Sequence, residues 1–297
     1  MSTAVSIDGK RRVAVAGSVG AVAPARGRTR WWVEALALLW LLWIYDALSN
    51  FAPLRLHAAV AHAEGLLHVE QALHLDPEQA LDSWLAGHHT LGVILSNYYD
   101  NAHFVVTLGL LGWLWWRRAD IYRPLRNSLV IVNLLAFVVF WLYPVAPPRM
   151  LGGFVDVVGL SHAFGSFHSG SLASHADELA AMPSLHIAWA VWCSVALWRM
   201  SRRSWVRALA VAYPFVTAFA VVATGNHFML DILGGLAAIG LSLWIVAVVE
   251  RRRAARAARS RVLSKDAAAP VGVEAHAQRR PAYRMSQTCY EVGDRVD

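Results

Sequence analysis

The segment His227–Val249, HFMLDILGGLAAIGLSLWIVAVV, is long and apolar enough to cross a membrane as a helix. The hydrocarbon core of a bilayer takes about 20 apolar residues in helical form. The ionisable side chains of this segment, His227 and Asp231, both stand at its beginning. The segment therefore predicts a transmembrane helix that carries polar chemistry at one end.

Five other segments of the chain have a similar apolar character: Trp31–Leu48, Thr90–Trp116, Pro124–Tyr143, Ser184–Met200 and Trp205–Thr224. The whole chain is 57% hydrophobic and 16% charged, whereas soluble domains carry about 25% charged residues. Helices are the expected form, because a backbone in lipid must satisfy its hydrogen bonds within the segment. We expect an all-α fold, a polytopic membrane helix bundle with about six transmembrane helices.

The distribution of Lys and Arg predicts the orientation of this bundle. Of the 27 basic residues, all but Arg55 and Arg149 lie before the first span, after the sixth, or at the junctions of spans two and three and of spans four and five. Because basic residues favour the cytoplasmic side, both termini are expected in the cytoplasm. This placement also accounts for the net charge of +7, so we expect a membrane-embedded protein with no nucleic-acid partner.

The organisation that follows has three parts. Residues 1–30 and 251–297 are expected to be disordered basic cytoplasmic tails, and residues 31–250 to form the membrane domain. The outer loops are then residues 49–89, in which an apolar helical pattern indicates an interfacial helix, and residues 144–183, an irregular Gly-rich loop.

Polar residues gather where the spans meet the outer face. Arg149 ends the sequence Tyr-Pro-Val-Ala-Pro-Pro-Arg after span three, His186 ends Met-Pro-Ser-Leu-His at the start of span four, and His227 begins span six. Ionisable groups within a membrane span are costly and usually functional. Their expected meeting at one depth is the main functional signal of the sequence.

The residue types in these clusters suit phosphoryl chemistry. Asp231, four residues after His227, can accept one imidazole N–H and leave the other nitrogen nucleophilic. Ser184 can cap a helix whose free N–H groups attract anions, and the planar fork of Arg149 fits phosphate oxygens. Each feature alone also has a structural interpretation, as a helix cap or an ordinary loop arginine.

A further polar cluster lies in the outer third of span two and has two interpretations. Its residues line a headgroup pocket, or they form a buried Asp–His pair that joins helices beside interfacial tyrosines. The cluster consists of Asn97, Tyr98, Tyr99, Asp100 and His103.

Together the outer clusters resemble the type 2 phosphatidic acid phosphatase (PAP2) superfamily. Pro-Ser-Leu-His186 is similar to its Pro-Ser-Gly-His element, and His227-x-x-x-Asp231 to its last element. The resemblance implies that His227 is a nucleophile forming a phosphohistidine, that Asp231 orients it and that His186 is the general acid. It further implies that Arg149 and Ser184 hold the phosphoryl oxygens of a lipid substrate, with neither metal nor cofactor.

The sequence also departs from the phosphatases of that superfamily. Their Lys of the first motif and the Arg before the last His have no counterpart, since Val221, Val222 and Ala223 occupy the latter region. This thinner phosphate clamp, with Pro-Val-Ala-Pro-Pro-Arg149, is more similar to the inositolphosphotransferase subgroup. Hydrolase and transferase remain open, as do the lipid, the acceptor and the oligomeric state; the alternative class is a non-catalytic lipid-binding or scaffold membrane protein.

Overall fold

The structure, a computed structural model, describes residues 29–50, 55–160 and 179–268. Its elements are α1 (Trp31–Asn50), α2 (Leu56–Leu73), α3 (Glu78–Ala86), α4 (His89–Arg117), α5 (Ala119–Leu142), the 3-10 helix η2 (Pro148–Met150), α6 (Val157–Leu160), α7 (Leu185–Met200), α8 (Ser204–Ala223) and α9 (Met229–Ala268). Extended pairing in these ranges is limited to an isolated bridge between Val145 and Ala180. The fold class, an all-α membrane helix bundle, is confirmed.

The six segments expected to span the membrane correspond to α1, α4, α5, α7, α8 and α9. Among the described residues, α5, α8 and α9 are long and apolar enough to cross a membrane, and α1 contains a shorter apolar stretch, Trp31–Ile44. The total of six spans and the side on which the termini lie stay predictions.

The chain divides into two compact units, residues 1–251 and 252–297. Helix α9 continues to Ala268, past the boundary at residue 250 that the sequence suggested. Residues 1–28 and 269–297, most of the two expected tails, lie outside the described residues.

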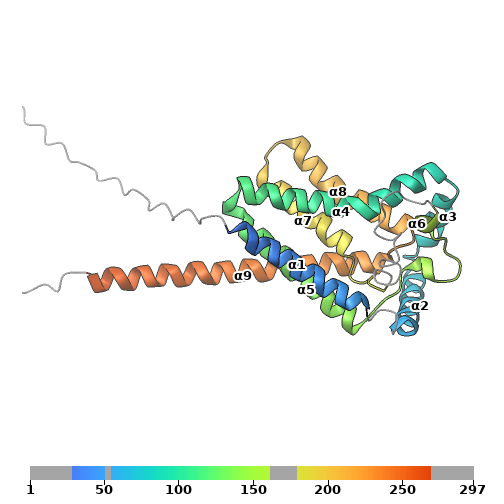
Figure 1. Cartoon of the computed structure of the whole chain (residues 1–297), viewed down its shortest axis with the longest axis horizontal. Coiled ribbons are helices and arrows are strands. Elements are labelled where there is room, and N and C mark those ends of the chain that lie inside the picture. Colours follow the sequence, from blue (N-terminus) through green and yellow to red (C-terminus); the bar gives the residue numbers. More distant parts are fainter. Residues whose placement is uncertain (1–28, 51–54, 161–178, 269–297) are drawn as a thin grey trace, which may run out of the picture. The chain divides into compact units, whose positions relative to one another are not determined.

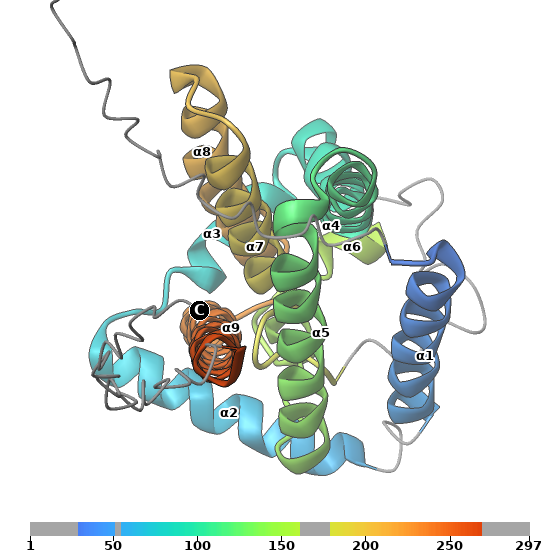
Figure 2. The same cartoon turned by 90° about the vertical axis from the view of Figure 1, so that its left-hand side faces the viewer.

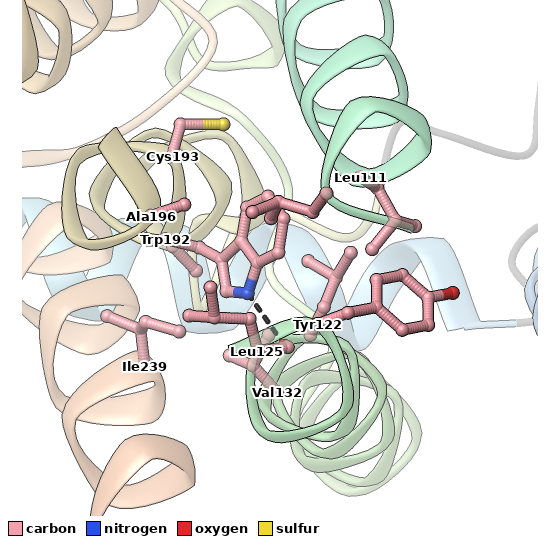
Figure 3. Close-up of a cluster of buried hydrophobic side chains, with 11 residues drawn as sticks. Leu111, Tyr122, Leu125, Val132, Trp192, Cys193, Ala196 and Ile239 are labelled. Atoms are coloured by element: carbon pink, nitrogen blue, oxygen red, sulfur yellow. Dashed lines mark hydrogen bonds between the residues drawn. The ribbon is translucent and has the colours of Figure 1, made fainter. Parts of the chain in front are cut away.

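The core of the first unit is built around Trp192 of α7 (Figure 3). Its indole is fully buried against Leu111 of α4, Leu125 of α5 and Ile239 of α9. The indole N–H donates to the carbonyl of Leu125 at 2.8 Å, so burial leaves no unsatisfied donor. This packing fixes the relative positions of the helices that carry the candidate site.

The short elements gather at one end of the bundle, where Figure 1 shows α2, α3 and α6 beside the beginning of α9. Helix α2 runs crosswise to α5 (Figure 2) and buries Ala59 and Ala63 against Val145 and Phe228. The segment 49–89, the expected first outer loop, therefore contains a helix, and this helix covers the chain beside His227. The position of α2 at a membrane interface stays a prediction.

Helices α7 and α9 meet closely at this end because α9 has glycines there. A Cβ at Gly235 would lie 2.5 Å from the carbonyl oxygen of Ser184, and one at Gly234 would lie 3.4 Å from Pro183. The absence of side chains thus lets the beginning of α7 rest directly on the backbone of α9.

Candidate functional site

His227 lies in the tight turn between α8 and α9. Gly225 has φ +65°, a backbone conformation that glycine adopts without strain. The amides of Asn226 and His227 both donate to the carbonyl of Val221, at 3.0 and 3.1 Å. The sequence predicted a helix that begins at His227, but α9 begins two residues later, at Met229. His227 therefore belongs to the turn and not to the helix.

The imidazole of His227 is buried and held by two acceptors at Nδ1. The carbonyl oxygen of Ala181 lies 2.9 Å away and Oδ2 of Asp231 lies 3.4 Å away. Both are acceptors, so Nδ1 carries the proton and Nε2 keeps its lone pair. Ala181 is itself fixed by its N–H, which donates to Val145 at 3.2 Å.

His186, in the first turn of α7, faces this lone pair. Its Nδ1 lies 3.3 Å from Nε2 of His227, and since Nε2 accepts, Nδ1 of His186 donates. The His186 ring stacks on Tyr99 with centroids 4.5 Å apart and meets His103 edge-on at 4.3 Å. Two aromatic rings of α4 therefore hold the second imidazole in place.

Asp231 is fully buried and links three parts of the site. Its Oδ2 accepts the Phe228 N–H at 2.9 Å, as a side chain in the first turn does in a capping box, besides facing the His227 imidazole. Its backbone carbonyl accepts the Ser184 N–H at 3.1 Å. One residue thus positions the beginning of α9, the imidazole and the beginning of α7.

Arg149, in η2, is tied to the turn that carries His227. Its backbone N–H donates to Gly225 at 2.8 Å, and its guanidinium donates to Oδ1 of Asn226. The guanidinium also bonds to Tyr99, and its Nε lies 3.8 Å from Asp156. Asn226 and Asp156 were not among the residues predicted for the site.

Ser184 caps α7 as its position predicted. Its hydroxyl accepts the Ile187 N–H at 3.5 Å, and the residue is fully buried. The hydroxyl is therefore engaged with its own helix, and contact between Ser184 and a phosphate stays a prediction.

The polar cluster of α4 is divided between two faces of the helix. Tyr99 and His103 face His186, whereas the Tyr98 hydroxyl bonds to Thr217 of α8 at 2.8 Å. Asn97 donates to the carbonyl of Val93 within α4. His103 Nδ1 bonds to the Tyr99 carbonyl at 2.9 Å, and Asp100 is buried at 2% exposure.

Three buried carboxyl groups of α2 and α3 were missed from the sequence: Glu70, Glu78 and Asp82. Oε1 of Glu70 accepts the Leu230 N–H at 2.6 Å, and Oε1 of Glu78 accepts the Met229 N–H at 2.8 Å. Asp82 accepts the Val155 N–H at 2.7 Å, and burial raises its pKa. The sequence feature that could have identified them is the presence of acidic residues in apolar helical segments, without Lys or Arg nearby in the sequence.

The described part of the chain contains no group of three or more His, Cys, Asp or Glu side chains arranged to bind a metal ion. The chemistry that these residues supply is that of two facing imidazoles, a guanidinium and buried carboxyl groups.

By its fold the chain is an all-α membrane helix bundle with two imidazoles meeting at one end. Residues 64–245, more than half of the chain, match the family model of the PAP2 superfamily, and the chain belongs to this superfamily. Membership supports a phosphatase- or phosphotransferase-type function on a lipid phosphate, as does the apolar character of an integral membrane protein. Searches of curated proteins and of solved structures give no match.

Proposed function

We propose that the protein transfers a phosphoryl group from a lipid phosphate or phosphodiester headgroup through a phosphohistidine on His227. The observation that carries this proposal is the 3.3 Å approach of His227 Nε2 to His186 Nδ1, with the other nitrogen of His227 bound to Ala181 and Asp231. A fixed tautomer exposes one nucleophilic nitrogen, and a proton donor stands directly opposite it.

In the first half-reaction, Nε2 of His227 attacks phosphorus in line with the ester bond to the lipid alcohol. The N–P bond forms as the P–O bond breaks, and His186 gives its proton to the departing alkoxide. The Nδ1 proton of His227 stays on the ring, where Ala181 and Asp231 stabilise the positive charge that develops.

In the second half-reaction, His186 takes a proton from an acceptor whose oxygen attacks the phosphohistidine. The N–P bond breaks and His227 returns to its starting form. Water as the acceptor makes the protein a phosphatase, and an alcohol makes it a phosphotransferase.

Arg149 supplies the fixed positive charge for the transferring group. Its guanidinium is held by Asn226, beside His227 in sequence, and by Tyr99, which stacks on His186. Preorganised donors of this kind lower the barrier to phosphoryl transfer. Ser184 and the α4 residues Tyr99 and His103 are proposed to complete the headgroup pocket.

The thin phosphate clamp favours the transferase branch, and within it the inositolphosphotransferase-like subgroup. Val221, Val222 and Ala223 are buried apolar residues where the phosphatases have an arginine. We further propose six spans with cytoplasmic termini, which put the site on the non-cytoplasmic face of the cell membrane. The support is the segregation of 25 of the 27 basic residues to the termini and to one set of junctions between spans.

The experiment is a trapping and product assay on the purified full chain in detergent, using phosphatidic acid and phosphatidylinositol labelled with ³²P. We expect label on His227 that survives alkali and is lost in acid. Hydrolysis releases free phosphate from phosphatidic acid and inositol phosphate from phosphatidylinositol. Transfer to an added alcohol gives a phosphomonoester from phosphatidic acid and a new phosphodiester from phosphatidylinositol. His227→Ala removes the label, and His68→Ala, an exposed histidine of α2, keeps it.

If neither lipid labels the wild-type protein while it still binds both, the chain is a lipid-binding protein and the enzymatic proposal is wrong. If the label sits on a residue other than His227, the role of His227 as nucleophile is wrong.

A further inference from the structure

Two glutamates from helices outside the expected spans hold the first amides of α9. Glu70 of α2 accepts the Leu230 N–H at 2.6 Å, and Glu78 of α3 accepts the Met229 N–H at 2.8 Å. Both side chains are fully buried. The first N–H groups of a helix have no partner within the helix, and here they directly follow His227 and Phe228. The two glutamates therefore fix the place where the His227 turn joins α9.

The same two side chains interact electrostatically with each other. An ionised carboxylate only accepts hydrogen bonds, so a bond between two carboxyl groups requires a proton on one of them. The Oε1 atoms already bind backbone amides, and both Oε2 atoms are buried without a hydrogen-bond partner among the described residues. A proton on one carboxyl group lets it donate to the other, so we place the shared proton between the two Oε2 atoms.

We propose that Glu70 and Glu78, sharing one proton, are positioning residues that hold His227 in line with His186 by fixing the N-terminus of α9. The inference rests on the proposed role of His227 as nucleophile, and adds to it two residues that touch neither the substrate nor the imidazoles.

The surroundings explain why one proton stays on the pair at neutral pH. Burial, with the charges of Glu78 and Asp231, raises the pKa of Glu70 to about 8, and burial also raises the pKa of Glu78. Asp76, in the α2–α3 link, adds a further negative charge facing Glu78. The amides at the beginning of α9 favour one negative charge on the pair. A second negative charge on the pair would be repelled by the first and by Asp231.

The sign of the pH dependence follows from these raised values. Between the ordinary glutamate pKa of 4.5 and about 8, the folded protein binds more protons than the unfolded chain. The stabilisation from the shared proton is therefore complete below about pH 4.5, falls progressively as the pH rises, and is gone above about pH 8. Above that value the two carboxylates repel each other, and the turn that carries His227 loses its fixed position.

Glutamine variants separate the shared proton from simple packing. In Glu70→Gln the amide oxygen still accepts the Leu230 N–H, and the amide N–H₂ takes over the role of the proton toward Glu78. In the double variant Glu70→Gln with Glu78→Gln, two N–H₂ groups face each other and neither finds an acceptor. Glu64→Gln, an exposed residue on the same helix, is the matched control.

The measurements are kcat and KM for dioctanoyl phosphatidic acid, the Kd for orthovanadate, and the apparent unfolding temperature in detergent, each from pH 6 to 10. We expect the unfolding temperature of the wild type to fall as the pH rises from 6 to about 8 and then to level off. We expect kcat to fall as the pH passes about 8, where the folded pair loses its proton, with KM nearly constant. Glu70→Gln keeps kcat within about threefold at pH 7 and loses the alkaline fall. The double variant loses at least about tenfold in kcat, the effect of buried groups left unsatisfied.

An alkaline fall in Glu70→Gln equal to that of the wild type overturns the shared proton. A double variant with wild-type kcat overturns the positioning role, and if it does not fold, Glu70→Gln and Glu78→Gln individually decide the question through the alkaline fall. If the wild type neither turns over the lipid nor binds orthovanadate, the proposed function fails first. The unfolding curves then report the shared proton alone, and the positioning role is overturned with the function.

Discussion

The carbonyl oxygen of Ser184 lies where a Cβ on Gly235 would approach it to 2.5 Å. Ser184 caps α7 and precedes His186 by two residues, so this contact sets the distance between His186, the proposed general acid, and α9, the helix that follows His227. The Ser184 carbonyl and the α9 backbone are both rigid, so neither can move aside for a larger side chain at Gly235.

We predict that Gly235→Ala displaces the beginning of α7, with a loss of stability of about 1–3 kcal/mol and a fall in kcat. Gly240→Ala is the control, since a Cβ at Gly240 of the same helix meets nothing within 4 Å. Unfolding in detergent and phosphatidic acid turnover measure both effects. Equal behaviour of the two variants would show that the Ser184 contact is unimportant.

His186 is predicted to matter in proportion to how poor the leaving group is. His186→Ala should lower turnover of phosphatidic acid, which releases an alkoxide, by about 10²–10⁴, the usual contribution of general acid catalysis. On p-nitrophenyl phosphate, whose leaving group needs no proton, the loss should be much smaller. Equal losses on the two substrates would mean that His186 does not act as the acid.

Asp231→Asn is predicted to lower kcat less than is usual when a histidine loses a carboxylate that is its only acceptor. The Ala181 carbonyl lies closer to Nδ1 of His227, at 2.9 Å, than Asp231 does, at 3.4 Å. It therefore keeps the tautomer in the variant, and we expect a loss of about 10–100-fold in kcat. Asp231→Ala also removes the acceptor for Phe228 and should unfold at lower temperature. A loss in Asp231→Asn as large as that of His227→Ala would contradict this account.

Chelation and phosphate mimicry test the donor set directly. Activity should be unchanged in EDTA, since the proposed transfer uses the imidazoles of His227 and His186 and the guanidinium of Arg149. Orthovanadate should inhibit the wild type and should not bind His227→Ala. Loss of activity on chelation, with recovery on adding a divalent metal, would point to metal-assisted transfer.

The helices could be predicted because lipid imposes length and apolarity on a span. The segments containing Trp192 and Ile239 were identified as spans for this reason, and both residues lie in the core. The beginning of α9 was predicted two residues early, since only the folded turn shows that Asp231 caps Phe228. Apolar length limits a span, whereas local hydrogen bonds decide its first residue.

The candidate site was predictable where side-chain type carries the signal. His186 and His227 do meet, and the helical spacing of Tyr99 and His103 accounts for their shared face, with Tyr98 turned toward α8. The Ala181 carbonyl was not predictable, because every residue has a carbonyl and only the pairing with Val145 brings this one to His227.

For Arg149, the role of the guanidinium's shape can be separated from the role of its positive charge. Its backbone N–H binds Gly225, and its guanidinium binds Asn226 and Tyr99 at once. A lysine has one compact ammonium group and cannot make these contacts while also presenting a fork to phosphate. We therefore predict that Arg149→Lys lowers kcat/KM for phosphatidic acid by about a hundredfold, as loss of one oxyanion donor does.

Arg55 provides the control for this prediction, because it is the other basic residue of the expected outer loops. Its guanidinium donates to the carbonyl of Trp141 and lies over the Trp141 ring, away from the contacts of Arg149. Arg55→Lys should keep kcat/KM within about threefold at the same ionic strength. Arg55 has in common with Arg149 only its positive charge in the expected outer loops, and lysine keeps that charge. If both variants lose activity equally, the effect is one of net surface charge on substrate approach, and the fork of Arg149 is not the cause.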